Sequence, residues 1–450
     1  MTCFKNIDLN LFFILIPFIY GFQVVFGNNF IGLIPYLFLF VFLIRTIVFN
    51  SLLQNSYKKP SVLTFFVLLY TCLILGSCAK EFITEGFISA IRLGVLYFLP
   101  ISLYFIVKNI EKDNDVKIIL NIIIITTCLV SIEVLYEFTV HSLKVMPTWF
   151  EIKNYNYVKT ISVDDPLQLL GWYRPTGLLE HVHVTGSVLS IGFIGSYLFY
   201  LLKGKIFYLL GTLLCFVGMI ACAARLALAS GALAFVLISC LYYKKAFFIT
   251  KSTRKIFTVG LGVVLITGAL YFAFHSHVYF WSNAYTKVIK TGQFMPSAST
   301  TSATGAISAV SERALVMTTE TKHIVSSLKN EFIYLLFGHG WQTSASLEKR
   351  IMNDDFFVLQ ILGQIGIVGL IVFYGMFFCG LIFLVHNLKN LSAEKQLLLV
   401  SAGVILFLLG ISTLHSGVVL RKSVYYLLFL ALGIVHRFTR VKGISGTVNK

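Results

Sequence analysis

About twelve long apolar runs divide this chain of 450 residues, and they constrain its fold more than any other feature. A helix that crosses the hydrocarbon core of a bilayer needs about 20 mostly apolar residues. Because backbone polar groups cannot stay unpaired in lipid, we expect each run to be an α-helix. The apolar block over 206–243 is broken only by Arg225, where we predict a tight turn between two helices. The runs lie near residues 10–27, 30–49, 61–78, 86–107, 116–138, 177–202, 206–222, 226–243, 256–275, 356–385, 396–413 and 423–436.

Charged residues are too scarce for a soluble protein. They make up 12% of the chain, and hydrophobic residues make up 57%, whereas a soluble domain carries about 25% charged residues. This composition excludes a cytosolic globular enzyme, a disordered chain and a small disulfide-stapled secreted domain. We therefore expect an all-α, polytopic integral membrane protein with about 12 transmembrane helices.

The basic residues predict the orientation of these helices. The net charge is +17, from 36 Lys and Arg against 19 Asp and Glu, and short loops rich in Lys and Arg stay in the cytoplasm. Alternate loops hold these residues, for example Lys58 and Lys59, Lys203 and Lys205, and Lys389 and Lys395. Both termini are then cytoplasmic. The charge excess suits membrane lipids and an anionic lipid-linked substrate as partners, and nucleic acid is not expected.

The same topology divides the chain into five segments. Residues 1–138 hold the N-terminal transmembrane helices, 139–176 form a first periplasmic loop, and 177–276 hold the central helices. Residues 277–353 form a large periplasmic loop, in which the stretch over 311–330 has the apolar spacing of a surface helix. Residues 354–450 hold the C-terminal helices.

Ionisable residues inside membrane spans are costly and therefore mark candidate functional positions. Arg92 and Glu133 fall at similar depth on two successive helices, where they form either a buried ion pair or part of a site, and Glu137 lies one turn beyond Glu133. Most histidines and all four tryptophans also map to the outer side. Rings there stack on sugars or belong to an interfacial aromatic belt. The resulting substrate-binding candidates are Trp172, His181, His183 and Trp341.

The sequence shows no convincing metal motif. The cysteines form no CxxC pair, and His181 and His183 are two residues apart, so they do not share a helix face. The adjacent carboxylates Asp354 and Asp355 also diverge. We therefore expect no metal and no cofactor.

Several segments resemble the O-antigen ligase and polymerase superfamily. LLFGHGWQTS followed by DFFVLQILGQIGIVGLIVF resembles its signature, in which a GxG turn (here Gly338 and Gly340) precedes a helix that carries Gln and GxxG (here Gln360, Gly366 and Gly369). ACAARLALASGALAF resembles its arginine helix and places the arginine at Arg225. SERALVMTTETKHI matches at Arg313, and RPTGLLEHVHVTGSVLS matches more loosely at Arg174 and Gly177. The resemblance covers roughly residues 170 to 385.

One departure favours a particular branch of that superfamily. Ligases carry a histidine where this chain has Asp355, and Wzy-type polysaccharide polymerases often carry an acidic residue there. The resemblance thus implies a GT-C-like enzyme of the bacterial inner membrane with its active site facing the periplasm. Such an enzyme joins undecaprenyl-diphosphate-linked oligosaccharide repeat units, with a chain-length regulator as a further partner. The alternatives are an O-antigen ligase that transfers glycan to lipid A core and, in a different class, a transporter or flippase of the lipid-linked unit.

The proposed chemistry assigns roles to the remaining candidates. A diphosphate leaving group needs positive charge where negative charge develops, and arginine binds phosphate bidentately. Arg225 and Arg313, with Arg174 in support, suit that role. The acceptor hydroxyl needs a base or an orienting group. The candidates for it are Asp355 first, then Glu180, His181 and His339, with Asp354 as a substrate-binding neighbour.

Each of these residues also has a purely structural interpretation. Asp354 and Asp355 suit helix capping, Arg225 suits snorkelling to lipid headgroups, and Arg313 suits a solvated loop. Gly338 and Gly340 are expected as turn formers rather than sugar ligands.

Overall fold

The computed structural model describes residues 7–18, 33–49, 61–110, 112–143, 182–222, 224–243, 332–338, 357–388, 391–413 and 417–439, with Pro175, Gly177 and Leu179. Within these residues the fold is all-α. The α-helices are α1 (Ile7–Leu15), α3 (Ile34–Phe49), α4 (Val62–Thr84), α5 (Phe87–Leu93), α6 (Ser102–Lys108), α7 (Asp113–Leu143), α11 (Val182–Lys203), α12 (Ile206–Ala221), α13 (Arg225–Tyr243), α16 (Phe332–Phe337), α18 (Phe357–Leu388), α19 (Ala393–Ser412) and α20 (Lys422–Thr439).

Eleven of the twelve apolar runs contain a helix, and the twelfth, 256–275, lies outside the described residues. Within the described ranges, six helical segments are long and apolar enough to cross a membrane, which indicates a multi-pass membrane protein. These segments are Val62–Thr84, Phe87–Lys108, Asp113–Thr139, Val182–Lys203, Gln360–Leu388 and Glu394–Ser412.

The turn predicted at Arg225 is confirmed. Helix α12 ends at Ala221, and α13 begins at Arg225. By contrast, α11 begins at Val182 rather than at residue 177. Gly177 adopts a left-handed conformation, with φ +60°, and a residue in that conformation cannot continue a right-handed helix.

The fourth apolar run is not a uniform helix. Between α5 and α6 lie a π-helical turn (Gly94–Phe98) and a 3₁₀ turn (Leu99–Ile101). Pro100 explains the irregularity, because its ring removes a backbone donor and clashes with the preceding turn of a regular helix. The chain adjusts its winding there and still continues in one overall direction.

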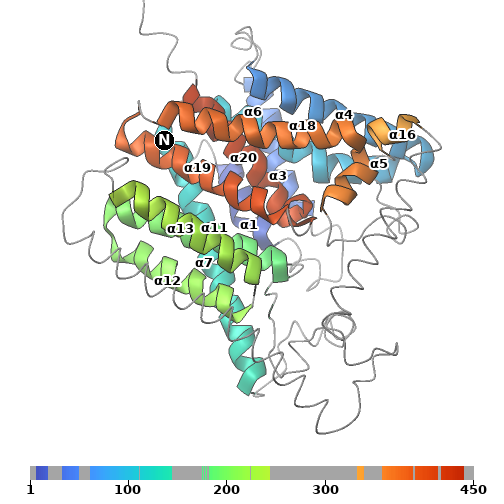
Figure 1. Cartoon of the computed structure of the whole chain (residues 1–450). Helices are drawn as coiled ribbons and strands as arrows, with labels where there is room; N and C mark the ends of the chain where they lie inside the picture. Colours follow the sequence, from blue (N-terminus) through green and yellow to red (C-terminus); the bar gives the residue numbers. More distant parts are fainter. Residues whose placement is uncertain are drawn as a thin grey trace, which may run out of the picture.

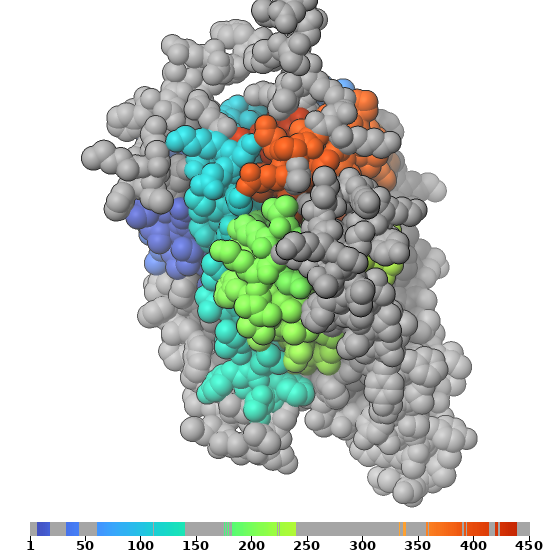
Figure 2. Space-filling model, turned by 90° about the vertical axis from the view of Figure 1, so that its left-hand side faces the viewer, coloured from blue at the N-terminus to red at the C-terminus, as the bar shows by residue number. Residues whose placement is uncertain are grey.

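The helices pack in a defined order. α11, α12 and α13 lie side by side, and α19 separates them from α18, which packs against α4 (Figure 1). α7 crosses the molecule beside α11 and α12, as Figure 2 shows from another side. The Ser131 hydroxyl on α7 donates to the Leu214 carbonyl of α12 at 2.7 Å. α7 thus ties the N-terminal helices to the central ones.

The outward face of α18 is apolar. Ile371, Phe378, Ile382 and Val385 repeat at helical spacing and are all more than half exposed. Inside the bundle, aromatic side chains fill the core, and the Tyr425 hydroxyl donates to that of Tyr70 at 3.1 Å. Apolar residues that face outward in a helical stripe are what a lipid-facing surface requires.

Ion pairs gather at one end of the bundle, which we call the basic end. Lys117 of α7 pairs with Glu394 of α19, and Arg437 of α20 pairs with Asp113 of α7. Lys395 Nζ lies 3.7 Å from Asp113 Oδ2. Basic residues from three regions assigned to the cytoplasm by the loop pattern therefore meet at one end.

Candidate functional site

Few of the candidate residues fall in the described part of the chain. His183 lies in the first turn of α11, and the backbone of Arg225 begins α13. The other candidates lie outside the described residues: Trp172, Arg174, Glu180, His181, Arg313, His339, Gly340, Trp341, Asp354 and Asp355. The structure nevertheless describes the helix ends that are next to these candidates in the sequence, and it shows which of those ends lie close together.

A small pocket lies between α11, α13 and α19, which we call the His183 pocket. His183 and Ser187 of α11 line it together with residues of the first turns of α13 and the last turns of α19. The remaining lining residues are Ala224, Leu226, Ala227, Ser230, Leu408 and Ser412. Arg225 lies in sequence between the lining residues Ala224 and Leu226, so α13 begins at the edge of the His183 pocket.

Small residues bring α11 and α13 together there. A Cβ atom on Gly186 would lie 2.2 Å from the Cβ of Ala224 and 3.0 Å from that of Ala227. Only glycine at 186 allows this approach, which sets the first turn of α11 beside the start of α13. Sequence patterns do not single out Gly186, Ser230 or Ser412 as site residues, because small residues carry little chemical signal on their own.

Two carboxylates of α7 anchor the chain that leads into α11. Glu137 is fully buried, and its Oε2 accepts a hydrogen bond from the Gly177 backbone N–H at 2.9 Å. A Cβ on Gly177 would lie 2.4 Å from Glu133 Oε2. The left-handed glycine thus fits against both side chains, and α7 fixes the position of Gly177 ahead of α11.

The predicted ion pair between Arg92 and Glu133 is wrong. The Arg92 side chain is exposed on α5 and makes no ion pair with any residue that the structure describes. Glu133 is half-buried on α7 beside Gly177. Equal depth on two successive helices is not enough to form an ion pair, because the two side chains also have to face each other around their helix axes.

α18 is not the single straight span that the sequence predicts. Gly366 has φ +68° and ψ −169°, which interrupts the helix. The ring of Phe357 then packs against Phe373 at a centroid distance of 5.1 Å and against Tyr374 at 6.3 Å. In a straight helix, residues 16 positions apart are separated by about 24 Å. Residues 357–365 therefore fold back on the helix that follows, and we call this unit the α18 hairpin.

The fold-back brings the start of α18 toward the end of α19, which also borders the His183 pocket. Phe357 contacts Tyr374, whose hydroxyl donates to Thr413 Oγ1 at 3.2 Å. Thr413 follows Ser412, which lines the His183 pocket. The carboxylates Asp354 and Asp355 lie outside the described residues, but the helix that they precede begins in this neighbourhood.

A backbone contact joins α16 to the α18 hairpin. Gly338, just after α16, and Gly366 both have φ +68°. A Cβ on Gly338 would lie 2.4 Å from the carbonyl carbon of Gln364, and a Cβ on Gly366 would lie 2.2 Å from the carbonyl oxygen of Leu336. Neither position accepts a side chain. Gly338 is thus a turn former by its conformation, as the sequence predicts.

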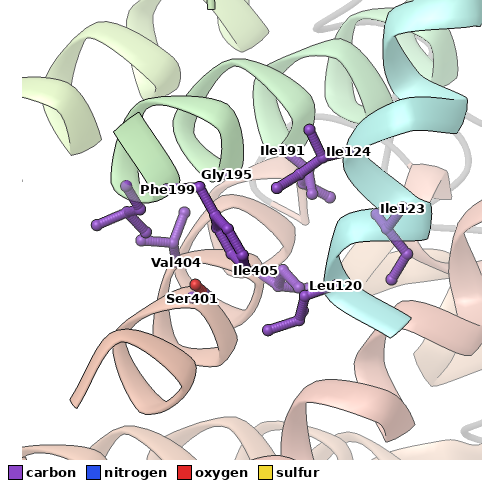
Figure 3. Close-up of a pocket in the computed structure, with 10 residues that line it drawn as sticks. Leu120, Ile123, Ile124, Ile191, Gly195, Phe199, Ser401, Val404 and Ile405 are labelled. Atoms are coloured by element: carbon purple, nitrogen blue, oxygen red, sulfur yellow. The ribbon is translucent and has the colours of Figure 1, made fainter. Parts of the chain in front are cut away.

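A second pocket lies between α7, α11 and α19 (Figure 3). Its lining is almost wholly apolar, with Ile124, Ile191 and Ile405 among the residues around it and the Ser401 hydroxyl as its polar group. Both pockets hold only about one or two water molecules. With no ionisable lining residue, this second pocket offers no group for acid–base chemistry.

Metal ligands do not cluster in the described ranges, where no group of three or more His, Cys, Asp or Glu side chains converges. None of the cysteines whose thiols the structure describes is in a disulfide; they are Cys72, Cys78, Cys128, Cys215, Cys222 and Cys379.

Comparison of the chain with protein-family models, with curated proteins and with solved structures finds no match. Any functional conclusion therefore rests on the residues and their geometry.

Proposed function

We propose that this chain is a polysaccharide polymerase of the O-antigen type. It joins undecaprenyl-diphosphate-linked oligosaccharide repeat units at the periplasmic face of the bacterial inner membrane. In this proposal about twelve transmembrane helices form a GT-C-like enzyme with cytoplasmic termini and two long periplasmic loops. Glycosyl transfer proceeds without a metal, because arginines neutralise the diphosphate.

The contact between Gly338 and the α18 hairpin carries the proposal. The resemblance to the polymerases depends on a glycine turn and on a helix with GxxG that lies further along the sequence. In the structure these two segments touch through backbone atoms at Gly338 and Gly366. The glycine turn and the GxxG helix, which are separate in the sequence, therefore form one structural unit. This contact supports the interpretation of the two segments as a single motif.

The proposed roles follow from charge and position. Arg225, at the edge of the His183 pocket, and Arg313 bind the diphosphate and stabilise the charge that develops on it as the glycosyl bond breaks. Asp355 orients the acceptor hydroxyl or accepts its proton, with Glu180 and His339 in support. Arg174, His181, His183, Trp172, Trp341 and Asp354 contact the substrate in this scheme.

In vitro turnover tests the function. Purified protein is incubated with the undecaprenyl-diphosphate-linked repeat unit of the bacterium that encodes it, with and without a chelator. A ladder of glycan lengths that persists with chelator is the expected result. Formation of product only on addition of lipid A core would instead indicate a ligase.

Substitution of the arginines tests the mechanism. Arg225→Ala and Arg313→Ala are each expected to reduce polymer formation at least about 100-fold at normal protein levels, because loss of one preorganised charge costs about that factor. Asp355→Asn is expected to reduce it strongly if the carboxylate acts on the acceptor, and only slightly if it caps the helix. Normal ladders from both arginine variants would refute the diphosphate clamp.

One observation favours a transporter of the lipid-linked unit as a second candidate. Transporters often bind their substrate at helices that are interrupted inside the membrane, and α18 is interrupted at Gly366. Reconstitution in vesicles separates the two functions. A transporter moves the intact lipid-linked unit across the bilayer and forms no new glycosidic bond.

A further inference from the structure

The α18 hairpin buries two carboxamides whose hydrogen bonds are unmade. Gln360 is 6% exposed and Gln364 is 4% exposed. Gln360 Oε1 and both polar atoms of Gln364, Oε1 and Nε2, have no hydrogen-bond partner. Because both side-chain polar atoms of Gln364 are affected, exchanging its amide oxygen and nitrogen does not change the observation.

Other buried carboxamides in the described helices have partners. Asn387 Nδ2 donates to the Phe383 carbonyl at 2.7 Å, and Gln396 Nε2 donates to the Leu388 carbonyl at 3.0 Å. A buried amide without a partner costs about 1–3 kcal/mol, and the large majority of buried polar side chains are paired. Two adjacent exceptions on one short helix therefore call for an external partner.

The spacing of these amides suits one ligand. Residues four apart share a helix face about 6 Å apart, so both carboxamides are on one side of residues 357–365. The carbonyl carbon of Gln364 is also within 2.4 Å of the Cβ position of Gly338. The ligand would therefore lie near the contact between the C-terminal end of α16 and the α18 hairpin.

The chemistry of the unmade bonds narrows the ligand class. A cation would satisfy the two amide oxygens but not Gln364 Nε2, and an anion would satisfy the nitrogen but not the oxygens. A hydroxyl group donates and accepts, and adjacent hydroxyls match a carboxamide. A neutral, hydroxyl-rich ligand is thus the one that meets all three atoms.

We propose that Gln360 and Gln364 bind sugar hydroxyls of the lipid-linked substrate and hold the glycan at the α18 hairpin. This inference rests on the proposed function, since it takes the substrate class from there. The two glutamines are binding residues for the glycan, distinct from the arginines that contact the diphosphate.

Binding measurements with two lipids test this role. The probes are the native undecaprenyl-diphosphate-linked repeat unit and undecaprenyl diphosphate without sugar, titrated against purified full-length protein in detergent. The unsubstituted protein is expected to bind the glycosylated lipid about tenfold more tightly or better, since each hydrogen bond contributes a factor of up to about ten. Gln364→Met and, independently, Gln360→Met should lose this difference and bind the bare lipid unchanged.

Stability supplies a second readout and a matched control. Gln364→Met is expected to raise the melting temperature of the ligand-free protein, because it removes unpaired buried atoms at similar volume. Gln396→Met, which breaks an existing bond, should lower the melting temperature and keep the preference for the glycosylated lipid.

Each contrary outcome has a distinct meaning. A glycan preference that survives in both Gln364→Met and Gln360→Met overturns the inference and leaves the proposed function standing, with water as the partner of the amides. Failure of the unsubstituted protein to bind either lipid refutes the proposed function itself. Thermal stabilisation by sodium that disappears in Gln364→Met would also overturn the inference, in favour of a cation site.

Discussion

At the residue scale, two left-handed glycines determine how α16 meets the α18 hairpin. Gly366→Ala would place a methyl group 2.2 Å from the Leu336 carbonyl oxygen. The backbone conformation of Gly366, with φ +68° and ψ −169°, alone costs an L-residue about 1–3 kcal/mol, and the steric conflict with the backbone adds to it. We expect a large fall in melting temperature or loss of folded protein, measured by thermal unfolding in detergent. Gly76→Ala is the matched control, because nothing lies within 4 Å of that Cβ position on α4; equal melting temperatures for the two variants would contradict this explanation.

The identity of the residues predicted the glycine turn but not the backbone contact that the turn makes with the α18 hairpin. Gly338 and Gly366 stood out in the sequence because they resemble a family pattern. Their reciprocal backbone contact depends on a tertiary approach that no local pattern encodes. The same limit explains Gln360 and Gln364: polar residues in an apolar run are visible in the sequence, but their lack of partners depends on the whole environment.

At the element scale, apolar length predicted the helices well, because the need to pair the backbone in lipid overrides local preferences. It failed at α18, where the apolar run continues through Gly366 and hides the fold-back. It also missed the π-helical turn ahead of Pro100. The length and periodicity of an apolar run indicate which residues avoid water. They do not change when the helix turns back on itself within the run, so they cannot predict such a turn.

The ends of α7, α19 and α20 are joined by the ion pairs of the basic end. Asp113→Asn removes a charged partner of Arg437, whose side chain is 10% exposed, and of Lys395. We expect a loss of about 1–2 kcal/mol, larger than for an exposed pair because the arginine is largely buried. Asp115→Asn is the control, since Asp115 is also in the first turn of α7 and no ion pair of the described residues includes it. Equal destabilisation by both variants would assign the effect to the helix dipole instead.

At the scale of the whole molecule, the account depends on which end of the bundle faces the cell exterior. The ends of α7 and α19 that carry Glu137 and Ser412 meet the starts of α11 and α13. The basic end is opposite, because its ion pairs join the starts of α7 and α19 to the end of α20. The start of α4 lies there too, since Ser61 is 3.3 Å from His436 near the end of α20. The alternation of basic loops in the sequence predicted that the helix ends at the basic end and those near the His183 pocket lie on opposite sides of the bundle.

Accessibility of single cysteines tests the central claim most directly. In a cysteine-free background, Glu85→Cys places a thiol in the exposed turn between α4 and α5, and Asn114→Cys places one in the first turn of α7 near the basic end. A membrane-impermeant maleimide should label Glu85→Cys in intact cells and Asn114→Cys only after the inner membrane is permeabilised. The reverse pattern would put the His183 pocket in the cytoplasm, which is incompatible with polymerisation at the periplasmic face.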